Sequence, residues 1–442
     1  MLNRAFDYRT YLDALAADGM NYTRIFTGVY CEFPGQFGIG HNTLAPEAGD
    51  LLAPWARSEV PGYANGGNKF DLSRWDTAYF ARLDDFLRLA AERDIIVELT
   101  FFTSQYQPGA WARSPLHPAN NINGTDAIEG HRVFPTLENG NLLAHQEAMV
   151  REIVRAVNAH DNLFFEIQNE PWADQTRLVD ILNPSLAWAL RDQPQVGGHW
   201  NNRVEVATPA SLAWQRRVVD WITEEEARLP QQHLIAQNYC NYGYPVAEID
   251  PRVSILNFHY AYPHAAWDNY GQRRVLSFDE SGFAGSADST YRAQAWAFLL
   301  AGGGVFNNLD YSFYVGAEDG RGPNDAPGGG GPELRQQLKL LREFLTSFSL
   351  WRMQPDRQTF WRVEGARAYL LHDPGQACAV YLHGQGPATL RLDLPAGTWQ
   401  ATWLNPATGD RSQALPIQHP GGELVLATPP FGPDLALGLR RE

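Results

Sequence analysis

The strongest constraint on the fold is a regular alternation of short apolar segments with longer helical ones, which continues to about residue 350. Seven segments have the length and apolar character of strands, and they begin near residues 22, 95, 162, 233, 253, 274 and 304. Segments with apolar residues at helical spacing lie between them, for example over residues 76–92 and 210–228. This alternation predicts an α/β fold in which helices cover a parallel sheet.

The length of the alternating region favours a (β/α)8 TIM barrel, which needs eight strands. The strand that is missing from our count would be strand one, before the first helix expected over residues 8–19, where only seven residues remain. Either the natural chain begins before this sequence, or an irregular segment fills the gap. Residues 28–75, 104–140 and 172–208 are predicted to be long loops that shape the active-site end.

The pattern changes after about residue 351, where short alternating segments follow one another with no helix between them. They cover residues 367–373, 377–383, 389–394, 399–404, 423–428 and 434–440. Turn signals such as Asp373-Pro-Gly and Asn405-Pro-Ala-Thr-Gly separate them. We therefore expect a catalytic barrel over residues 1–350 and a small antiparallel β-sandwich over residues 351–442.

Charge and composition argue against several classes of binding partner and bear on the cellular location. The net charge is −15 with no Lys/Arg-rich run, which argues against nucleic acid and anionic membranes as partners. No apolar stretch is long enough to cross a membrane, and the N-terminal residues MLNRAFDYRTYL lack the core of a signal peptide. We expect a cytoplasmic protein, or a secreted or periplasmic one if the sequence lacks its natural N-terminus. The sequence does not indicate an oligomeric state.

Two glutamates occupy the ends of predicted strands. Gln168-Asn169-Glu170-Pro171-Trp172 follows the apolar segment NLFFEI, and Ser277-Phe278-Asp279-Glu280 ends another. Catalytic groups of (β/α) barrels lie at the carboxyl ends of strands, and a facing pair of carboxylates is what glycoside cleavage requires. Asp279 competes with Glu280 for the second position, but strand alternation predicts that Asp279 points to the opposite face.

These motifs resemble clan A glycoside hydrolases, notably glycoside hydrolase family 5, over most of residues 8–347. The clan has Asn-Glu-Pro after strand four and a glutamate after strand seven, which this numbering reproduces if strand one is missing. Further matches are Arg24 in YTRIF, Asn238 and Tyr239 in QNY, and His259 and Tyr260 in FHY.

The resemblance implies a retaining O-glycosyl hydrolase that acts on the β-linkages of a carbohydrate and uses no cofactor or metal. Glu170 would be the acid/base and Glu280 the nucleophile. Asn169 would bind the sugar 2-hydroxyl, and Arg24 would keep Glu280 ionised. His259 and a neighbouring tyrosine, Tyr260 or Tyr262, would orient the carboxylates. We expect Glu166 to form a structural ion pair.

One departure from the family pattern concerns the side chain that would support the sugar. Strand eight of the clan often ends in a tryptophan that supports the sugar, but here the segment is Asn307-Asn308-Leu309-Asp310-Tyr311. The loop residues Trp172, Trp111 and Trp200 are the candidates to replace it.

The tail, with AVYLHG and LPAGTWQATWLNPATGD, resembles the C-terminal β-domain called "collagen-binding" that follows some clan A barrels.

Two other functions are compatible with the same fold. A non-catalytic carbohydrate-binding protein would keep the barrel, although the presence of both glutamates argues against it. A metal-dependent barrel hydrolase would need clustered ligands such as His-x-His or HExxH, and neither motif occurs. The sequence does not identify the sugar, the linkage, or endo against exo action.

Overall fold

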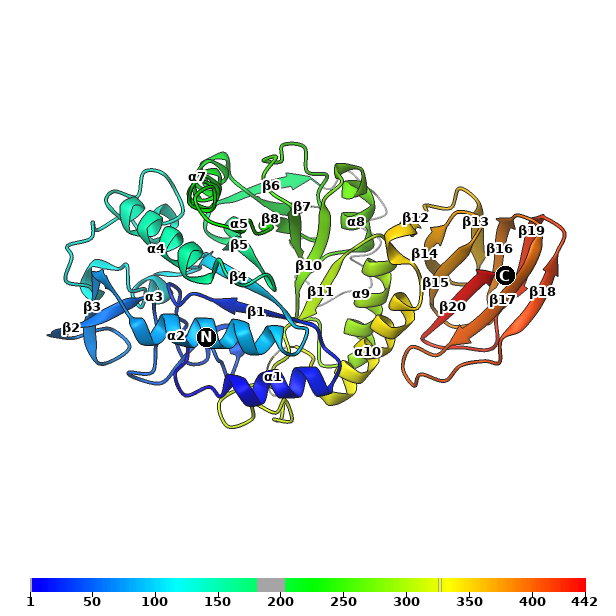
Figure 1. Cartoon of the computed structure of the whole chain (residues 1–442), viewed down its shortest axis with the longest axis horizontal. Coiled ribbons are helices and arrows are strands. Elements are labelled where there is room, and N and C mark those ends of the chain that lie inside the picture. Colours follow the sequence, from blue (N-terminus) through cyan, green and yellow to red (C-terminus); the bar gives the residue numbers. More distant parts are fainter. Residues whose placement is uncertain (1, 181–202, 325, 327) are drawn as a thin grey trace.

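Seven parallel strands form the central sheet of this computed structural model, which describes residues 2–180, 203–324, 326 and 328–442 (Figure 1). Their order is the order in the chain: β1 (Tyr22–Phe26), β4 (Ile96–Thr103), β5 (Leu163–Asn169), β8 (Ile235–Asn241), β9 (Ile255–His259), β10 (Val275–Ser281) and β11 (Val305–Asn308). Each neighbouring pair is parallel. The predicted barrel is confirmed.

The sheet is interrupted at one seam, between β1 and β11. Within the described part of the chain, β1 pairs only with β4, and β11 pairs only with β10. Phe6, Tyr11 and Phe313 line the cavity at this seam, with ring centroids 5.5 Å apart for Phe6 and Tyr11 and 4.9 Å apart for Tyr11 and Phe313. Irregular aromatic packing therefore stands at the position where the sequence predicted a missing strand.

Helices surround the barrel and begin at recognisable caps. They are α1 (Tyr8–Ala17), α2 (Thr77–Ala91), α4 (Leu142–Val157), α7 (Pro209–Glu226), α8 (Pro263–Asn269), α9 (Asp288–Leu300) and α10 (Pro332–Thr346), with the single turns α3 (Pro108–Trp111) and α5 (Pro171–Asp174). Asp7 and Asp76 accept hydrogen bonds from the first backbone N–H groups of α1 and α2. Proline occupies the first turn of α7 and α10, where its missing N–H costs nothing.

Two predicted loops contain strands. β2 (Trp55–Pro61) and β3 (Asn68–Trp75) form an antiparallel hairpin within residues 28–75. The signal was present, because Asn65-Gly66-Gly67 supplies the positive φ angles of its turn. β6 (Thr176–Asp180) and β7 (Arg203–Ala207) pair within the predicted loop 172–208, and β7 also bridges to β8. Residues 181–202 of that loop, including Trp200, lie outside the described residues.

Antiparallel strands make up the C-terminal part, as predicted. One sheet has the order β12 (Gln354–Pro355), β14 (Arg367–Asp373), β15 (Ala377–His383), β20 (Asp434–Arg441), β17 (Gly397–Leu404) and β18 (Leu415–His419). The second has the order β13 (Trp361–Glu364), β16 (Thr389–Leu394) and β19 (Gly422–Ala427). Trp361, Leu392 and Trp399 belong to the apolar core that both sheets share.

The C-terminal sheets pack on the barrel through α9 and α10, which lie between the two parts in Figure 1. The ring of Trp296 on α9 stacks on Tyr381 of β15 at 5.4 Å. Beside them, Arg292 of α9 pairs with Asp434 of β20 at 2.8 Å, and both side chains are almost fully buried. The interface therefore combines an apolar core with one buried ion pair.

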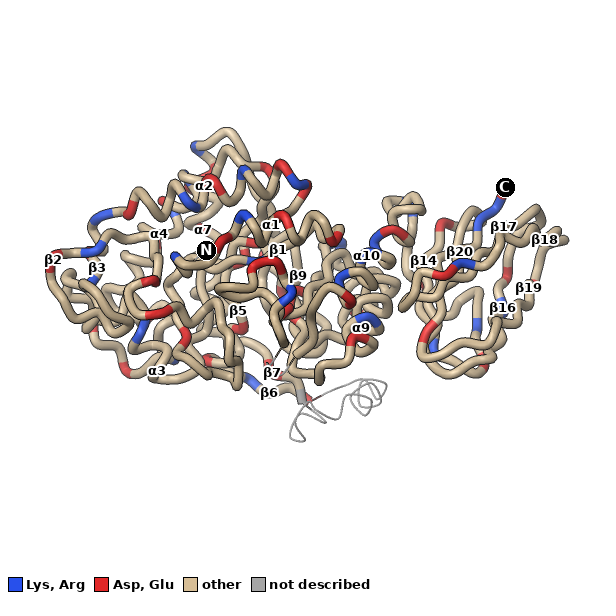
Figure 2. Tube along the Cα trace, turned by 90° about the horizontal axis from the view of Figure 1, so that it is seen from below, with Lys and Arg blue, Asp and Glu red and all other residues tan. Residues whose placement is uncertain are grey.

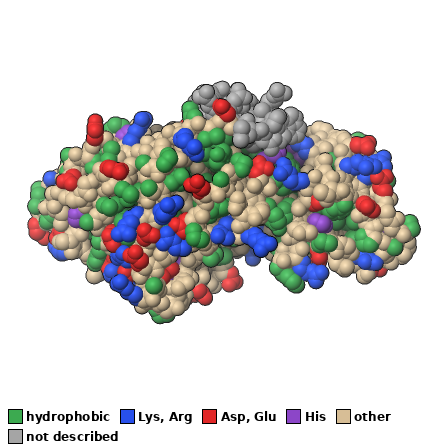
Figure 3. Space-filling model, turned by 90° about the horizontal axis from the view of Figure 1, so that it is seen from above, with side chains coloured by type: hydrophobic (Ala, Val, Ile, Leu, Met, Phe, Trp, Pro, Cys, Tyr) green, Lys and Arg blue, Asp and Glu red, His purple; other side chains and the backbone are tan. Residues whose placement is uncertain are grey.

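Charged residues are dispersed over the surface. Basic and acidic residues are both scattered along the trace in Figure 2, and both kinds are interspersed on the face shown in Figure 3, outside its grey atoms. No helix in the described part of the chain has the length and apolar character of a membrane span. The cysteines Cys31, Cys240 and Cys378 are buried and unpaired.

Arg292→Ala is expected to lower the free energy of unfolding by about 3–5 kcal/mol, because it leaves Asp434 charged, buried and without its cation. Urea denaturation of the whole chain measures this loss. Arg362→Ala removes an exposed pair with Glu423 and serves as the control, with an expected change within about 1 kcal/mol. Equal losses in the two variants would contradict the importance of the buried pair.

Candidate active site

Two glutamates converge at the carboxyl ends of the barrel strands. Glu170 directly follows β5, Glu280 lies near the end of β10, and both line a pocket of about 390 Å³. One carboxylate oxygen of each and one ring nitrogen of His259 all lie within 4.8 Å of one another. The structure therefore brings together the two carboxylates that the sequence singled out.

Unusual backbone conformations accompany this pocket. Glu170 has φ 47° and ψ 55°, a left-handed conformation that non-glycine residues seldom adopt, and α5 begins at the next residue. Tyr106, Tyr260 and Phe283, which also line the pocket, have φ angles of 58°, 50° and 54°. Such strain is commonly found at functional sites, where the surrounding structure holds it in place.

Three side chains fix Glu170. The hydroxyl of Tyr106 donates a 2.8 Å hydrogen bond to Oε2, and Nδ1 of His259 lies 2.9 Å from Oε1. The backbone N–H of Glu170 donates to Oδ1 of Asn238 at 3.3 Å. The carboxylate is thus held from two sides while it remains at the pocket surface.

Glu280 has more cationic surroundings. Nη1 of Arg24 lies 2.9 Å from its Oε2, the Tyr260 hydroxyl donates to Oε1 at 3.0 Å, and Nδ1 of His259 is 3.6 Å away. Burial raises the pKa of Glu280, and Glu170 adds to this effect, whereas His259 and Arg24 oppose it. The structure also selects between the two tyrosines: Tyr260 contacts Glu280, and Tyr262 is buried against Tyr242.

Arg24 contacts Glu280 directly and is linked to Glu170 through a chain of hydrogen bonds. It pairs with Glu166 at 2.6 Å, and its Nη2 donates to Oδ1 of Asn169 at 2.5 Å. The amide of Asn169 in turn donates to the Tyr106 hydroxyl at 2.7 Å. Burial opposes the charge of Arg24, but the surrounding carboxylates, Glu166 above all, hold its pKa well above the usual range. The predicted ion pair of Glu166 is confirmed.

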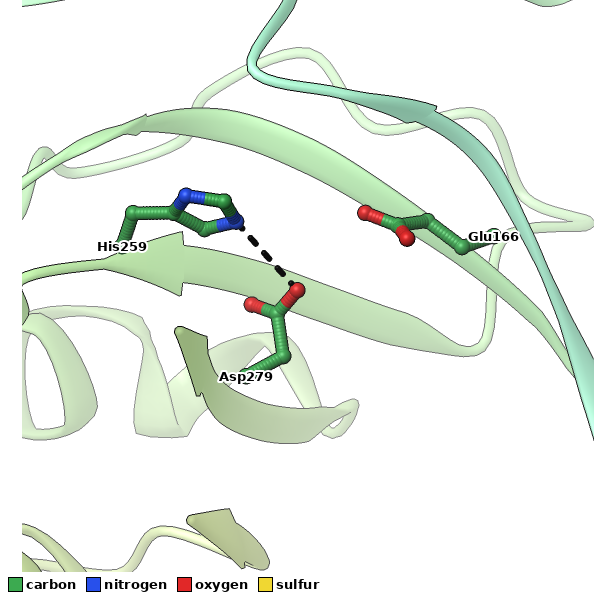
Figure 4. A group of neighbouring side chains, drawn as sticks. All are labelled: Glu166, His259 and Asp279. Atoms are coloured by element: carbon green, nitrogen blue, oxygen red, sulfur yellow. Dashed lines mark ion pairs between the residues drawn. The ribbon is translucent and has the colours of Figure 1, made fainter. Parts of the chain in front are cut away.

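Asp279 does not point away from the site, so that expectation was wrong. The register of β10 shifts between Ser277 and Glu280, which breaks the alternation and turns both acidic side chains inward. Oδ2 of Asp279 lies 3.3 Å from Nε2 of His259, as Figure 4 shows, and 3.5 Å from Arg24. Asp279 is fully buried, and neither of its oxygens has a hydrogen-bond partner within the described residues.

Two groups of side chains have the spacing of metal ligands. They are Glu166, His259 and Asp279, drawn in Figure 4, and Glu170, His259 and Glu280. The guanidinium of Arg24 contacts carboxylates of both groups, at 2.6 Å for Glu166 and 2.9 Å for Glu280. A positive charge is therefore already present between them, and these residues fit an ion-pair network better than a metal centre.

Four residues that the sequence analysis placed at the substrate site do not line the pocket: Trp172, Asn238, Tyr239 and His259, of which His259 still contacts both Glu170 and Glu280. Trp172 is buried behind His259, with ring centroids 5.3 Å apart, and Asn238 is buried against Glu166. Tyr239 donates a hydrogen bond to Gln237 and packs in the core. Trp111, the alternative sugar platform, packs on Phe134. A place in a loop or a match to a family motif does not determine how deeply a side chain is buried.

Four of the pocket residues that the sequence analysis did not predict carry polar groups close to the two glutamates or in the loop after β1. They are Tyr30, Glu32, Tyr106 and Tyr311. Tyr106 and Tyr311 each follow a barrel strand by three residues, so the strand-end rule pointed to them. Tyr30 and Glu32 belong to the loop after β1, and no pattern within that loop singled them out.

Comparison with known proteins shows the fold. No protein-family model and no curated protein matches the sequence. The solved structure of a glycoside hydrolase aligns at 12% identity and a TM-score of 0.59, over 98% of this chain and 88% of that one. A glycoside hydrolase of family 5 from Bacteroides vulgatus ATCC 8482 aligns at 11% identity and a TM-score of 0.58, over 98% and 85%. The chain shares the fold of these two glycoside hydrolases, and neither match identifies its C-terminal strands as a collagen-binding type.

Asp279→Asn is expected to lower the pKa of His259. Burial disfavours the imidazolium, but Glu280 and then Asp279 outweigh burial and hold this pKa well above its usual range. An NMR titration of the histidine side chains measures the change. His233, whose pKa is raised by Glu226 against the effect of burial, is the internal control in the same protein and should not move. An unchanged His259 would show that Asp279 does not act on it.

Proposed function

We propose that the protein is a retaining glycoside hydrolase that cleaves β-glycosidic bonds in an oligo- or polysaccharide by double displacement. The observation that carries the proposal is the convergence of Glu170 and Glu280, whose nearest oxygens lie within 4.8 Å. Retaining enzymes hold their carboxyl groups about 5–5.5 Å apart, whereas inverting enzymes need about 6.5–9.5 Å to admit a water molecule.

The surroundings of the two carboxylates suit different roles. Glu280 contacts the guanidinium of Arg24, which favours the ionised form that attacks the anomeric carbon. Glu170 has no arginine partner among the described residues, and the Tyr106 hydroxyl fixes its orientation. Glu170 would protonate the departing oxygen and later remove a proton from the water that hydrolyses the glycosyl ester on Glu280.

Glu280→Ala is expected to lower kcat by at least about 10⁴-fold, because no covalent intermediate can form. In the unaltered protein, activated 2-deoxy-2-fluoro glycosides of gluco, manno and galacto configuration should leave an adduct on Glu280, found by mass spectrometry of peptides. Glu47→Ala, an exposed change in the loop after β1, is the control. An adduct on any other residue would refute the assignment of the nucleophile.

Glu170→Ala is expected to spare aryl glycosides with good leaving groups far more than natural oligosaccharides, because only a poor leaving group needs a proton. Azide should restore turnover of the aryl substrates by attacking the glycosyl ester without base assistance. Steady-state kinetics with both substrate types measures the difference. Equal losses on the two types, without rescue by azide, would contradict the acid/base role.

A further inference from the structure

A third carboxylate faces the pocket but has no part in the double displacement. Glu32 lies in the loop after β1, is 5% exposed, and lines the same pocket as Glu170 and Glu280. Burial raises its pKa to about 7, against the hydrogen bonds from Asn42 and Tyr30, and the charge of Glu280 adds to the rise. Burying a carboxylate costs stability, and a buried carboxylate with a shifted pKa in a cleft is typical of a functional site.

The loop holds this carboxylate in a fixed orientation. The Tyr30 hydroxyl donates to Oε1 at 3.0 Å, Asn42 donates to Oε2, and Gln36 donates to the Tyr30 hydroxyl at 2.8 Å. These donors are neutral, and they use two of the roughly four acceptor positions of a carboxylate. Glu32 can therefore accept further hydrogen bonds from a ligand in the pocket.

A second polar group in the pocket also lacks a partner. The hydroxyl oxygen of Tyr311 is buried and makes no hydrogen bond within the described residues. Tyr311 lines the same pocket as Glu280, Glu32 and Glu170, and their charges add to the rise of its pKa that burial causes. A bound molecule with several hydroxyl groups would satisfy both Tyr311 and Glu32.

The arginines of the pocket are already paired. Arg24 contacts Glu166 and Glu280, as described above, and Arg335 pairs with Asp310 and Asp18, each at 2.6 Å. Among the described lining residues, no lysine or arginine remains without a carboxylate partner. A sugar that carries its own carboxylate would meet Glu32 without a compensating cation.

We propose that Glu32 is a specificity-determining residue that accepts hydrogen bonds from the hydroxyl groups of a neutral glycosyl unit and excludes uronic acids. The inference rests on the proposed function in that both use the same pocket. A merely structural Glu32 would hold the loop but would not affect the choice between neutral and anionic sugars.

Glu32→Gln tests this inference, because the amide keeps the size of the carboxylate and one of its two acceptor oxygens but removes its charge. Binding of glucose, galactose, mannose, xylose, glucuronate and galacturonate is measured by saturation-transfer NMR at pH 8, above the pKa of Glu32. The unaltered protein should bind a neutral sugar at least about tenfold more tightly than its uronate. In Glu32→Gln, the affinity for the neutral sugar should fall about tenfold. The ratio of the affinities for the neutral sugar and its uronate should also fall about tenfold.

Glu47→Gln is the matched control in the same loop and should change neither quantity, and thermal unfolding checks that Glu32→Gln is folded. A uronate that binds as tightly as its neutral partner, the absence of neutral-sugar binding, or an unchanged ratio in Glu32→Gln would overturn the inference. Turnover of aryl glycosides is measured with the same preparations. Selective binding without turnover would support this inference and contradict the proposed function, and turnover with an unchanged ratio would do the reverse.

Discussion

The arrangement of the pocket depends on the ion pairs that the guanidinium of Arg24 forms with carboxylates inside the barrel. This guanidinium contacts Glu166 on β5 and both Asp279 and Glu280 on β10, all inside the barrel. Without this cation, several carboxylates would share a region of low dielectric with only His259 to balance them. Because one rigid, planar group contacts carboxylates from two strands, it fixes their separation as well as their charge. Arg24 thus positions Glu280 from the barrel interior, and it is linked to Glu170 only through the side chains of Asn169 and Tyr106.

Two local irregularities place the reactive groups on this framework. The left-handed backbone at Glu170 ends β5 and turns its carboxylate toward the Tyr106 hydroxyl, while the register shift in β10 directs Asp279 and Glu280 into the same interior. Each departs from ideal strand geometry and is maintained by the contacts around it. His259 connects the two, since Nδ1 faces Glu170 and Nε2 faces Asp279. The reactive groups therefore lie at the points where β5 ends and where β10 departs from regular strand geometry.

Sequence alone predicted the parts of the molecule that follow regular periodicities. The order of the barrel strands, the missing strand, the β-rich tail and the strand-end glutamates all came from apolar patterns and their boundaries. Asp279 was misplaced because a bulge cannot be inferred from alternation, which assumes that no bulge occurs. Trp172 was assigned to the substrate from its place in a loop and Tyr239 from a family motif, and neither determines how deeply a side chain is buried. Glu32 was missed because a loop of irregular backbone carries no period from which the direction of a side chain follows.

The seam of the barrel gives the contact between Arg24 and Glu280 a second consequence. β1 forms one edge of the seam and β11 the other, and β10 is the neighbour of β11. No backbone hydrogen bonds of the described strands cross the seam. The side-chain ion pair of Arg24 and Glu280 does cross it. In the proposed mechanism, esterification of Glu280 would remove the negative charge from that pair. The covalent intermediate would then lack the charge of one side-chain link across the seam, while the contacts of Arg24 with Asp279 and of Arg335 with Asp18 and Asp310 would still join its two edges.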